Sequence, residues 1–476
     1  MSNISLTNDQ DKALSNFRSF IDDPESRIFI LKGYAGTGKT TLTGEFMEEL
    51  ENRKISFSLL ASTGRAAKIL ANATKHEAKT VHGEIYKFID LNQDLEKIAK
   101  EREERKVDST GQLLLNFELT SKDIDPFSDT QYYLVDEASM ISDKTDPTAT
   151  QAMFGTGRLL QDLLSFDPNG KFIFIGDVCQ LPPITQSFSP ALNADYFLSE
   201  YGIKAYESEL TKIVRQEAGN DIIIAAQKLR NLYYHPQDWK WARFPLKNHK
   251  NIHLVSTQAE LYSKYLDVVK EQGFNAGTIL CYSNRQCNTL AQLLRPSFGL
   301  RSSKLEKGDL LLVTQNNMVS GLMNGDLVTV EDITSREHRA GMTFIHVTVK
   351  EMFSQLEFSL PLIEEVLYSN FTNITQAQQK ELFIDYYYRM KAEHISPKSE
   401  YFKKRMWFDP YLNALRAVYG YALTCHKAQG GEWDYVFLDV PKNLGLQERP
   451  AVYQWVYTAV TRARKELYIV DGFWLM

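Results

Sequence analysis

Residues 33–40 have the sequence GYAGTGKT, which fits the pattern Gly-x-x-x-x-Gly-Lys-Thr of loops that hold phosphate groups with backbone N–H groups. Glycine lets the backbone approach oxygens that any Cβ would exclude. Lys39 would place its charge on the β- and γ-phosphates, and Thr40 would offer a hydroxyl to Mg²⁺. Residues 27–32 form a buried-strand pattern and residues 41–50 an amphipathic helix, whose N-terminus favours an anion. The sequence therefore predicts a nucleoside triphosphate site.

Two further apolar strands each end in polar residues suited to that chemistry. Residues 131–135 (QYYLV) run into Asp136-Glu137, which can hold Mg²⁺ through water and orient or deprotonate an attacking water. Residues 171–175 (KFIFI) lead into GDVCQLPP, where Gln180 would lie beside the γ-phosphate if the strands are neighbours. A turn-capping Asp-Glu pair is the simpler alternative, and the phosphate loop disfavours it.

Two residues have both a functional and a structural interpretation. Gln10 lies on a helix predicted within residues 4–22, where it is either a solvent-facing residue or a reader of adenine through its amide. His82 follows the short stretch Lys79-Thr80-Val81 and by itself is more typical of a structural histidine.

Length and composition limit the class of protein. A chain of 476 residues suggests three or four domains, and 43% hydrophobic with 24% charged residues is typical of a soluble globular protein. No apolar run reaches the ~20 residues that cross a bilayer, and the N-terminus has no secretory pattern. The net charge of −6 argues against indiscriminate coating of nucleic acid, but a local groove for one strand stays possible.

Cysteine and histidine usage favours a cytoplasmic protein without a metal centre of its own. The four cysteines are scattered, form no Cys-x-x-Cys pair and are expected to be reduced and mostly buried. They are Cys179, Cys281, Cys287 and Cys425. The nine histidines form no ligand cluster, so any metal is expected to arrive with the nucleotide.

Two segments look like additions to the α/β pattern. Within 88–130, residues 94–106 predict a solvated helix of mixed charge, and residues 113–119 predict a strand of a protruding hairpin. Phe117 lies near the tip or flank of that hairpin, or it simply packs. Residues 351–417 are aromatic-rich and partly helical, which indicates a packed arm.

The second half of the chain alternates between α/β and short-strand patterns. Residues 222–232 predict a helix and 278–282 a strand, before short strands begin near 310 with a hairpin signal at Asn324-Gly325. Residues 451–462 then predict a helix that leads into a final strand at 467–470. On such a helix Arg462 and Arg464 would lie about 200° apart, so only one would face a ligand, as an arginine finger does.

Taken in order, these segments resemble a superfamily 1 helicase of the RecD/Dda-like, 5′-to-3′ group. The resemblance covers most of the chain, apart from 88–130 and 351–417, and one departure is Ser62, where the family often has proline. The matching segments are GYAGTGKT (33–40), ASTGRAAKIL (61–70), KTVH (79–82), LVDEASM (134–140), GDVCQLPP (176–183), LTKIVRQ (210–216), NGD (324–326), TCHKAQGGEWD (424–434) and VYTAVTRARK (456–465).

The resemblance implies roles for individual residues. ATP with Mg²⁺ would be bound by Gln10 as adenine reader, Glu432 as ribose contact and the loop residues Gly33, Ala35, Gly36, Thr37, Gly38, Lys39, Thr40 and Thr41. Thr40 and Asp136 would hold Mg²⁺, and catalysis would use Lys39, Glu137, Gln180 and the arginine fingers Arg215 and Arg462. The single-strand track would include Thr63, Thr80, His82, Thr424 and His426, with Phe117 on the strand-separating pin.

The implied fold is α/β, with two RecA-like motor lobes that carry insertions. The expected boundaries are a first lobe of 1–87 and 131–207, a hairpin insertion of 88–130, a second lobe of 208–301 and 418–476, and an SH3-like β subdomain with an arm at 302–417.

The expected activity is ATP-driven 5′-to-3′ translocation on single-stranded DNA with unwinding of tailed duplexes, for which a monomer suffices. A single-strand-binding or recombination protein could be a partner, and no membrane is expected. Three alternatives remain open at this point: a motor directed to RNA, a translocase subunit of a recombination or nuclease complex, and a switch or small-molecule kinase with a phosphate loop.

Overall fold

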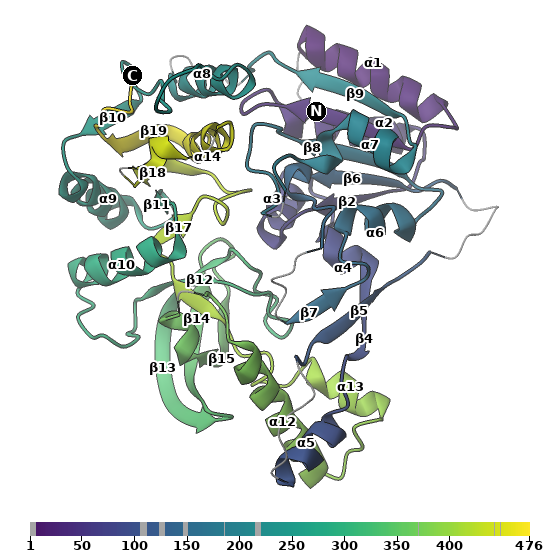
Figure 1. Cartoon of the computed structure of the whole chain (residues 1–476), viewed down its shortest axis with the longest axis vertical. Helices are drawn as coiled ribbons and strands as arrows, with labels where there is room; N and C mark the ends of the chain where they lie inside the picture. Colours follow the sequence, from purple (N-terminus) through teal and green to yellow (C-terminus); the bar gives the residue numbers. More distant parts are fainter. Residues whose placement is uncertain are drawn as a thin grey trace.

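Two parallel sheets stand side by side in the computed structural model, with smaller β and helical parts below them (Figure 1). The structure describes residues 6–104, 112–122, 129–145, 151–184, 186–214, 220–369, 371–441, 443–447 and 449–476. The α/β class with parallel sheets that the sequence predicts is therefore confirmed.

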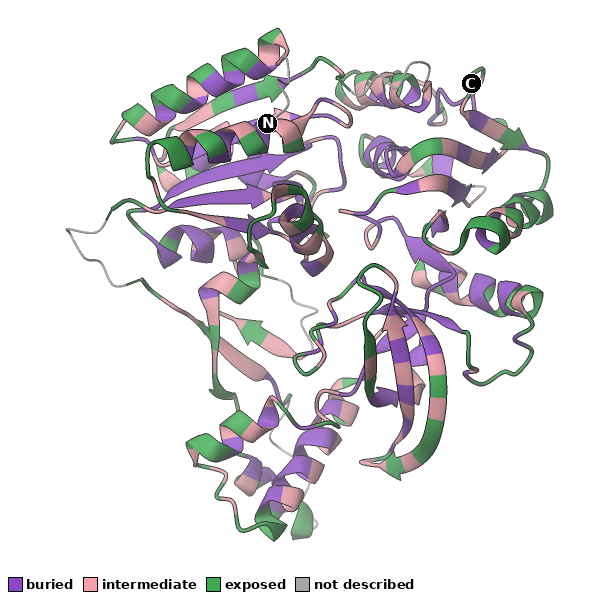
Figure 2. Ribbon diagram, turned by 180° about the vertical axis from the view of Figure 1, so that it is seen from behind, coloured by how far each residue is buried: buried purple, intermediate pink, exposed green. Residues whose placement is uncertain are grey.

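The first sheet has six strands in the order β3-β2-β6-β8-β1-β9, and every neighbouring pair is parallel. Its strands are β1 (Ile28–Gly33), β2 (Phe57–Ala61), β3 (Ala78–Thr80), β6 (Tyr132–Asp136), β8 (Lys171–Gly176) and β9 (Ala205–Leu210). The central strands are mostly apolar because helices cover both faces of the sheet, and they form the buried centre in Figure 2.

Four of the helices around this sheet, α1 (Asn8–Asp22), α3 (Gly64–Thr74), α4 (Val81–Ile85) and α7 (Ala194–Tyr201), begin at a residue whose side chain caps the helix. In α1, Thr7 and Gln10 form a reciprocal capping box, and Phe17 and Phe20 are buried on the sheet. The others are α2 (Lys39–Asn52) and α6 (Leu159–Phe166), with short 3-10 turns at Ala138–Met140 and Pro190–Leu192.

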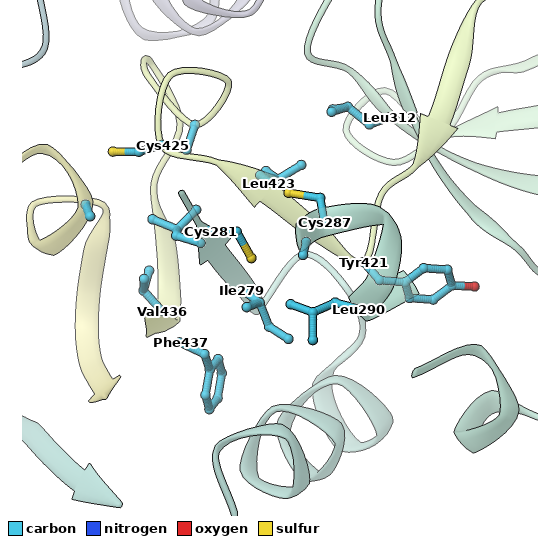
Figure 3. Close-up of a cluster of buried hydrophobic side chains, with 14 of the residues drawn as sticks. Ile279, Cys281, Cys287, Leu290, Leu312, Tyr421, Leu423, Cys425, Val436 and Phe437 are labelled. Atoms are coloured by element: carbon cyan, nitrogen blue, oxygen red, sulfur yellow. The ribbon is translucent and has the colours of Figure 1, made fainter. Parts of the chain in front are cut away.

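The second sheet has five parallel strands in the order β10-β19-β18-β11-β17. They are β10 (Ile252–Val255), β11 (Gly277–Cys281), β17 (Ala422–Thr424), β18 (Trp433–Asp439) and β19 (Ala463–Val470). Its helices are α8 (Ile222–Tyr234), α9 (Gln258–Gln272), α10 (Asn284–Leu294) and α14 (Ala451–Val460), and Leu444–Leu446 forms a 3-10 turn. All four cysteines are buried thiols, as expected, and three of them lie in the core of this lobe (Figure 3).

An antiparallel sheet of five strands, β15-β14-β13-β12-β16, lies next to the second sheet. Its strands are β12 (Leu310–Val313), β13 (Leu327–Arg339), β14 (Met342–Glu351), β15 (Glu357–Ile363) and β16 (Ala417–Tyr419), followed after β15 by the short helix α11 (Glu364–Leu367). The hairpin signal Asn324-Gly325 lies between β12 and β13, with Gly325 at φ 97°.

A small sheet below the first lobe differs from the predicted hairpin. Strands β4 (Tyr86–Leu91) and β5 (Leu115–Leu119) pair antiparallel, but a third strand, β7 (Ala152–Phe154), adds to β5 in parallel. The sequence analysis missed β7 because three residues are too few for a periodic pattern. Phe117 is stacked on Phe154 at 4.6 Å between ring centroids.

The aromatic-rich segment forms an arm of two helices, α12 (Gln376–Ala392) and α13 (Glu400–Met406), that packs against α5 (Leu95–Glu103) (Figure 1). The apolar contact between them, here called the arm contact, is made by Leu95, Ile98, Ala99, Leu113, Phe383, Ile384, Tyr386, Tyr387, Met390, Phe402 and Met406. The charged helix predicted at 94–106 therefore exists, but one of its faces is buried rather than solvated.

The second lobe is joined to the antiparallel sheet through a buried ion pair. Arg295, in the 3-10 turn Arg295–Phe298 after α10, donates from Nε and Nη2 to Asp309 at 2.7 and 2.8 Å, just before β12. Its other N–H groups donate to the carbonyls of Ser302 and Lys304, and both charged side chains are almost fully buried. The ion pair thus fixes the position of the start of β12 relative to the end of α10.

We expect Arg295→Met to destabilise the protein by about 3–5 kcal/mol, because Asp309 would stay buried without its partner. Urea unfolding followed by circular dichroism measures the change. Arg301→Met, at an exposed position nearby, is the matched control and should alter stability by less than about 0.5 kcal/mol. Equal losses in the two variants would contradict a role for the buried pair.

Candidate nucleotide-binding cleft

The carboxyl ends of the first sheet's strands bring the predicted site residues to one edge. The phosphate loop follows β1, Asp136 ends β6, and Asp177 follows β8, and these three strands are neighbours in the order β6-β8-β1. Because all are parallel, the residues that follow them meet at the edge where such sheets bind ligands.

The phosphate loop is closed by its lysine and by close backbone packing. Lys39 Nζ donates to the carbonyls of Gly33 and Tyr34 at 2.8 and 3.1 Å, which holds its charge over the loop. A Cβ on Gly33 would come within 2.7 Å of the Lys39 side chain. Gly38 has φ +81°, and a Cβ there would lie 2.5 Å from Gln10 Nε2. Both glycines are therefore required by the shape of the loop.

Gln10 is buried, so the solvent-facing alternative for it is wrong. Its Nε2 donates to the carbonyl of Thr37 at 3.2 Å, and its Oε1 accepts from the backbone N–H of Thr7 at 2.9 Å. The amide thus braces the phosphate loop from the side. The remaining loop residues, Ala35, Gly36, Thr40 and Thr41, lie at the start of α2 or just before it, with Ala35 and Gly36 on the wall of a cavity.

The acid pair is held close to this loop. Asp136 Oδ1 accepts from the backbone N–H of Glu137 at 2.9 Å, and Glu137 has φ 50°, a left-handed conformation that is costly for a residue with a Cβ. Burial and the neighbouring Glu137 charge raise the pKa of Asp136 to about 6, although Lys39 opposes the shift. An ionised, poorly solvated carboxylate beside the loop suits a divalent cation, and Thr40 offers the second oxygen.

Gln180 lies at the same edge of the sheet, and its side-chain amide oxygen has no hydrogen-bond partner among the described residues. That oxygen, Oε1, is buried. An orphaned buried polar atom at this edge of the sheet is expected where a ligand or water completes the site. The residues present therefore fit bound ATP with Mg²⁺.

A cavity of about 400 Å³ lies between the two lobes, with the phosphate loop on one wall. Its lining includes Ala35, Gly36, Asn220, Ile222, Ile223, Ala226, Glu432, Asp434, Thr461, Ala463, Arg464 and Lys465. Glu432, the predicted ribose contact, is thus on the wall that the second lobe supplies. Arg464 and Lys465 are ion-paired with Asp434 at 2.8 and 2.7 Å.

Of the two predicted arginine fingers, Arg462 is bonded within the second lobe rather than to the phosphate loop. Arg462 is 4% exposed and donates to the carbonyls of Thr458 and Gly431 within its own lobe. Arg215 lies outside the described residues.

The predicted helix 451–462 ends earlier, at Val460, so the argument from helical spacing is wrong. Pairing with β18 draws the chain into strand from Ala463, and Arg464 therefore stands on β19. The sequence pattern placed both arginines on one helix because it reflects local helix preference alone. In the fold, strand pairing outweighs that preference.

The first-lobe residues predicted to contact DNA lie at the β3–β2 end of the sheet. Thr63 Oγ1 accepts from the N–H of Ala66 and caps α3, and Thr80 Oγ1 accepts from Gly83 and caps α4. His82 is exposed at the start of α4, with its ring 5.2 Å from that of Phe154. Because β3 and β2 are the first two strands at one end of the sheet, these residues are separated from the phosphate loop by β6 and β8.

Thr424 and His426 are the corresponding residues of the second lobe. Thr424 ends β17, the edge strand of the second sheet, and is 8% exposed, and His426 follows two residues later. Burial lowers the pKa of His426 below its ordinary value, so its ring is neutral at physiological pH. A neutral ring contacts a nucleic acid by stacking or hydrogen bonding rather than by charge.

The NGD segment joins the antiparallel sheet to the first lobe. Asp326 pairs with Lys68 of α3, and the guanidinium of Arg65 lies 4.6 Å from the Trp433 ring centroid. The start of α3 is therefore held between two segments of the second half of the chain.

Within the described parts of the chain, no group of three or more His, Cys, Asp or Glu side chains could hold a metal by itself. No described helix is long and apolar enough to cross a membrane.

Comparison with known proteins gives two family matches in the order that the fold requires. The AAA domain family matches residues 5–233, which include the phosphate loop and acid pair, and the UvrD-like helicase C-terminal domain family matches residues 419–470. The ATP-dependent RecD2 DNA helicase of Deinococcus radiodurans is 24% identical over 443 residues, which is 93% of this chain. The chain is thus similar in sequence to a RecD-type helicase over most of its length.

The chain spans 46% of the length of that RecD2 protein. An uncharacterised protein of Acanthamoeba polyphaga mimivirus, R530, is 22% identical, with 94% of this chain and 96% of that protein covered. Among solved structures, Bacteroides Pif1 bound to single-stranded DNA gives a TM-score of 0.47 at 15% identity, over 98% of this chain and 93% of that one.

Sequence reasoning missed one contact between the two lobes. Asp177 and Tyr457 lie inside the segments GDVCQLPP and VYTAVTRARK, but no pattern indicated that they touch. In the structure Tyr457 Oη donates to Asp177 Oδ2 at 2.7 Å. Only contact across the two lobes reveals such a pair.

We expect Asp136→Asn to stabilise the protein at pH 7 while it lowers Mg-ATP hydrolysis on the order of 100-fold or more. The folded-state pKa of about 6 is above the ordinary value of 3.8, so the ionised form of Asp136 costs stability at neutral pH. The gain in melting temperature should be complete above pH 6 and should disappear as the pH falls below about 4.

Melting curves of both proteins between pH 3.5 and 8 check this, with the exposed Asp129→Asn as control. A variant that melts at the same temperature as the unchanged protein at pH 7 would contradict a strained carboxylate.

Proposed function

We propose that this protein is an ATP-driven DNA helicase that moves 5′-to-3′ on single-stranded DNA and unwinds tailed duplexes. The observation that carries the proposal is the assembly of Lys39, the Asp136-Glu137 pair and Gln180 on one edge of a parallel sheet, next to the phosphate-loop residues that line a cavity shared with a second parallel-sheet lobe. A nucleotide held between two lobes can convert hydrolysis into relative movement of the lobes.

In the proposed cycle, the phosphate loop residues 33–41 bind ATP, Gln10 reads adenine and Glu432 contacts the ribose. Bound Mg²⁺, held by Thr40 and Asp136, supplies charge neutralisation on the phosphates. Lys39 positions the γ-phosphate, Glu137 orients and deprotonates the attacking water, and Gln180 senses the γ-phosphate. Arg215 and Arg462 act as arginine fingers when the cleft closes.

Movement of Arg462 in this proposal requires the exchange of local hydrogen bonds. Its guanidinium lies against the carbonyls of Thr458 and Gly431 in the present state, and closure would transfer it to phosphate oxygens. Such charge-assisted bonds to phosphate are stronger than those to carbonyls.

The proposed single-strand track uses Thr63, Thr80 and His82 on the first lobe and Thr424 and His426 on the second. Support comes from their position at the β3–β2 end of the first sheet and at the edge strand β17 of the second, away from the phosphate loop, so nucleotide and DNA can occupy different sides of the same two lobes. We retain the boundaries 1–87 with 131–207, 88–130, 208–301 with 418–476, and 302–417 as the proposed domains, the last as an SH3-like subdomain with an arm.

The insertion at 88–130 is proposed to act as the strand-separating pin, with Phe117 on its flank. Phe117 is stacked on Phe154 and lies 6.1 Å from the Trp407 ring centroid, so its role would be to stiffen the pin together with any base contact. The arm contact supports this role, because it ties α5 of the pin to α12. Ion pairs of Arg102 with Glu381 and Lys403 with Asp90 border the contact.

The polarity and activity are tested with duplexes that carry a single-stranded tail at either the 5′ or the 3′ end. With Mg-ATP, we expect strand release from the 5′-tailed duplex alone and none with Lys39→Ala. Release only from the 3′-tailed duplex would overturn the polarity. Single-strand-stimulated hydrolysis without release would favour a translocase subunit that needs a recombination or nuclease partner, and stimulation by RNA alone would favour an RNA-directed motor.

The arm contact generates a separate prediction. Ile98→Asp places a charge in that buried cluster, and we expect unwinding to fall about tenfold while single-strand-stimulated ATP hydrolysis stays within about twofold. Lys97→Asp, exposed on the same helix, is the control and should keep both activities. Parallel loss of hydrolysis and unwinding in Ile98→Asp would contradict a specific role in strand separation.

A further inference from the structure

Helix α14 of the second lobe is bonded to the first lobe through one face. Gln454, Tyr457 and Thr458 have the i, i+3, i+4 spacing that shares a helix face, and all three are nearly fully buried. The segment they contact is 177–181, which follows β8 and contains Gln180, together with the phosphate loop.

Hydrogen bonds from α14 hold the backbone of segment 177–181 before and after Gln180. Gln454 Nε2 donates to the carbonyls of Val178 and Gln180 at 3.2 and 3.3 Å, and Thr458 Oγ1 accepts from the N–H of Leu181 at 2.9 Å. The backbone on each side of the Gln180 side chain is thus fixed by the second lobe. The side-chain Oε1 itself stays without a hydrogen bond among the described residues.

Tyr457 joins this segment to the phosphate loop through a single hydroxyl. The hydroxyl donates to Asp177 Oδ2 at 2.7 Å and accepts from the backbone N–H of Ala35 at 3.1 Å. Asp177 Oδ1 in turn accepts from the N–H of Cys179 at 2.9 Å, which closes the turn before Gln180. Ala35 lies on the cavity wall, so the hydroxyl stands at the border of the proposed nucleotide site.

We propose that Tyr457 is a positioning residue, whose hydroxyl transmits the position of the second lobe to Gln180 and the phosphate loop and so makes ATP hydrolysis depend on bound single strand. This inference rests on the proposed function. When the second lobe shifts on a nucleic-acid strand, α14 moves with it, and a rigid helix with four hydrogen bonds to 177–181 carries Gln180 along. The Tyr457 hydroxyl keeps Ala35 and Asp177 in register during that movement.

The physical reason that one hydroxyl matters is its burial. In a dry interface each hydrogen bond is stronger, and the loss of one leaves the buried Asp177 carboxylate and the Ala35 N–H without their shared partner. A displacement of about 1 Å in a group that aligns the reacting water can cost on the order of 100-fold in rate. Phenylalanine would keep the ring packing and remove only this link.

The test compares Tyr457→Phe with the unchanged protein in steady-state ATP hydrolysis, with and without saturating single-stranded DNA. We expect kcat with DNA to fall on the order of 10- to 100-fold, and by a larger factor than the rate without DNA, so that the ratio of the two rates falls as well. Thr458→Val, which removes the bond to Leu181 from the same helix face, should give the same signature. The ratio of stimulated to basal rate is the readout that a merely structural defect would not change alone.

Tyr453→Phe is the matched control, because Tyr453 is on the same helix but its ring packs on Phe244 of its own lobe, at 6.1 Å between centroids. It should retain full stimulation. Unchanged stimulation of ATP hydrolysis by single-stranded DNA in Tyr457→Phe, or a raised KM with unchanged kcat, would overturn the inference about Tyr457 and leave the proposed function intact. If ATP hydrolysis by the unsubstituted protein does not respond to single-stranded DNA, the proposed motor function is overturned, and the inference with it.

Discussion

The parallel pairing of β6, β8 and β1 is the constraint on which the cleft depends. Because these three strands are neighbours and run the same way, their ends bring the phosphate loop, Asp136 and Asp177 to one edge. The strands are buried on both faces, so they consist almost wholly of apolar residues, and a shift of register would move every one of them. The charged groups of the cleft are held by a core that contains none of them.

The second lobe contributes to this cleft through α14 and the segments beside it. Gln454, Tyr457 and Thr458 bind the first lobe, whereas Arg462, one turn later, stays bonded within its own lobe. The interface therefore contains both fixed contacts and a charged side chain with exchangeable ones. A motor requires this combination, since lobes that moved freely could not transmit force and lobes bonded everywhere could not move.

The contact at the other end of the molecule also combines two kinds of interaction. The arm contact joins α5 to α12 through apolar packing, which is non-directional and tolerates small displacements, while ion pairs border it. The cavity between the lobes and the arm contact are thus two separate connections between the halves of the chain.

The sequence by itself determined the α/β class, the phosphate loop, the acid pair and most strands, because these depend on local patterns such as GYAGTGKT and apolar runs of five or six residues. Only the tertiary structure decided that Gln10 is buried against Gly38, that α14 ends at Val460, that β7 joins the small sheet and that Tyr457 meets Asp177. Each of these depends on residues far apart in the chain. Local preference is weak beside strand pairing and burial, so no local pattern can specify them.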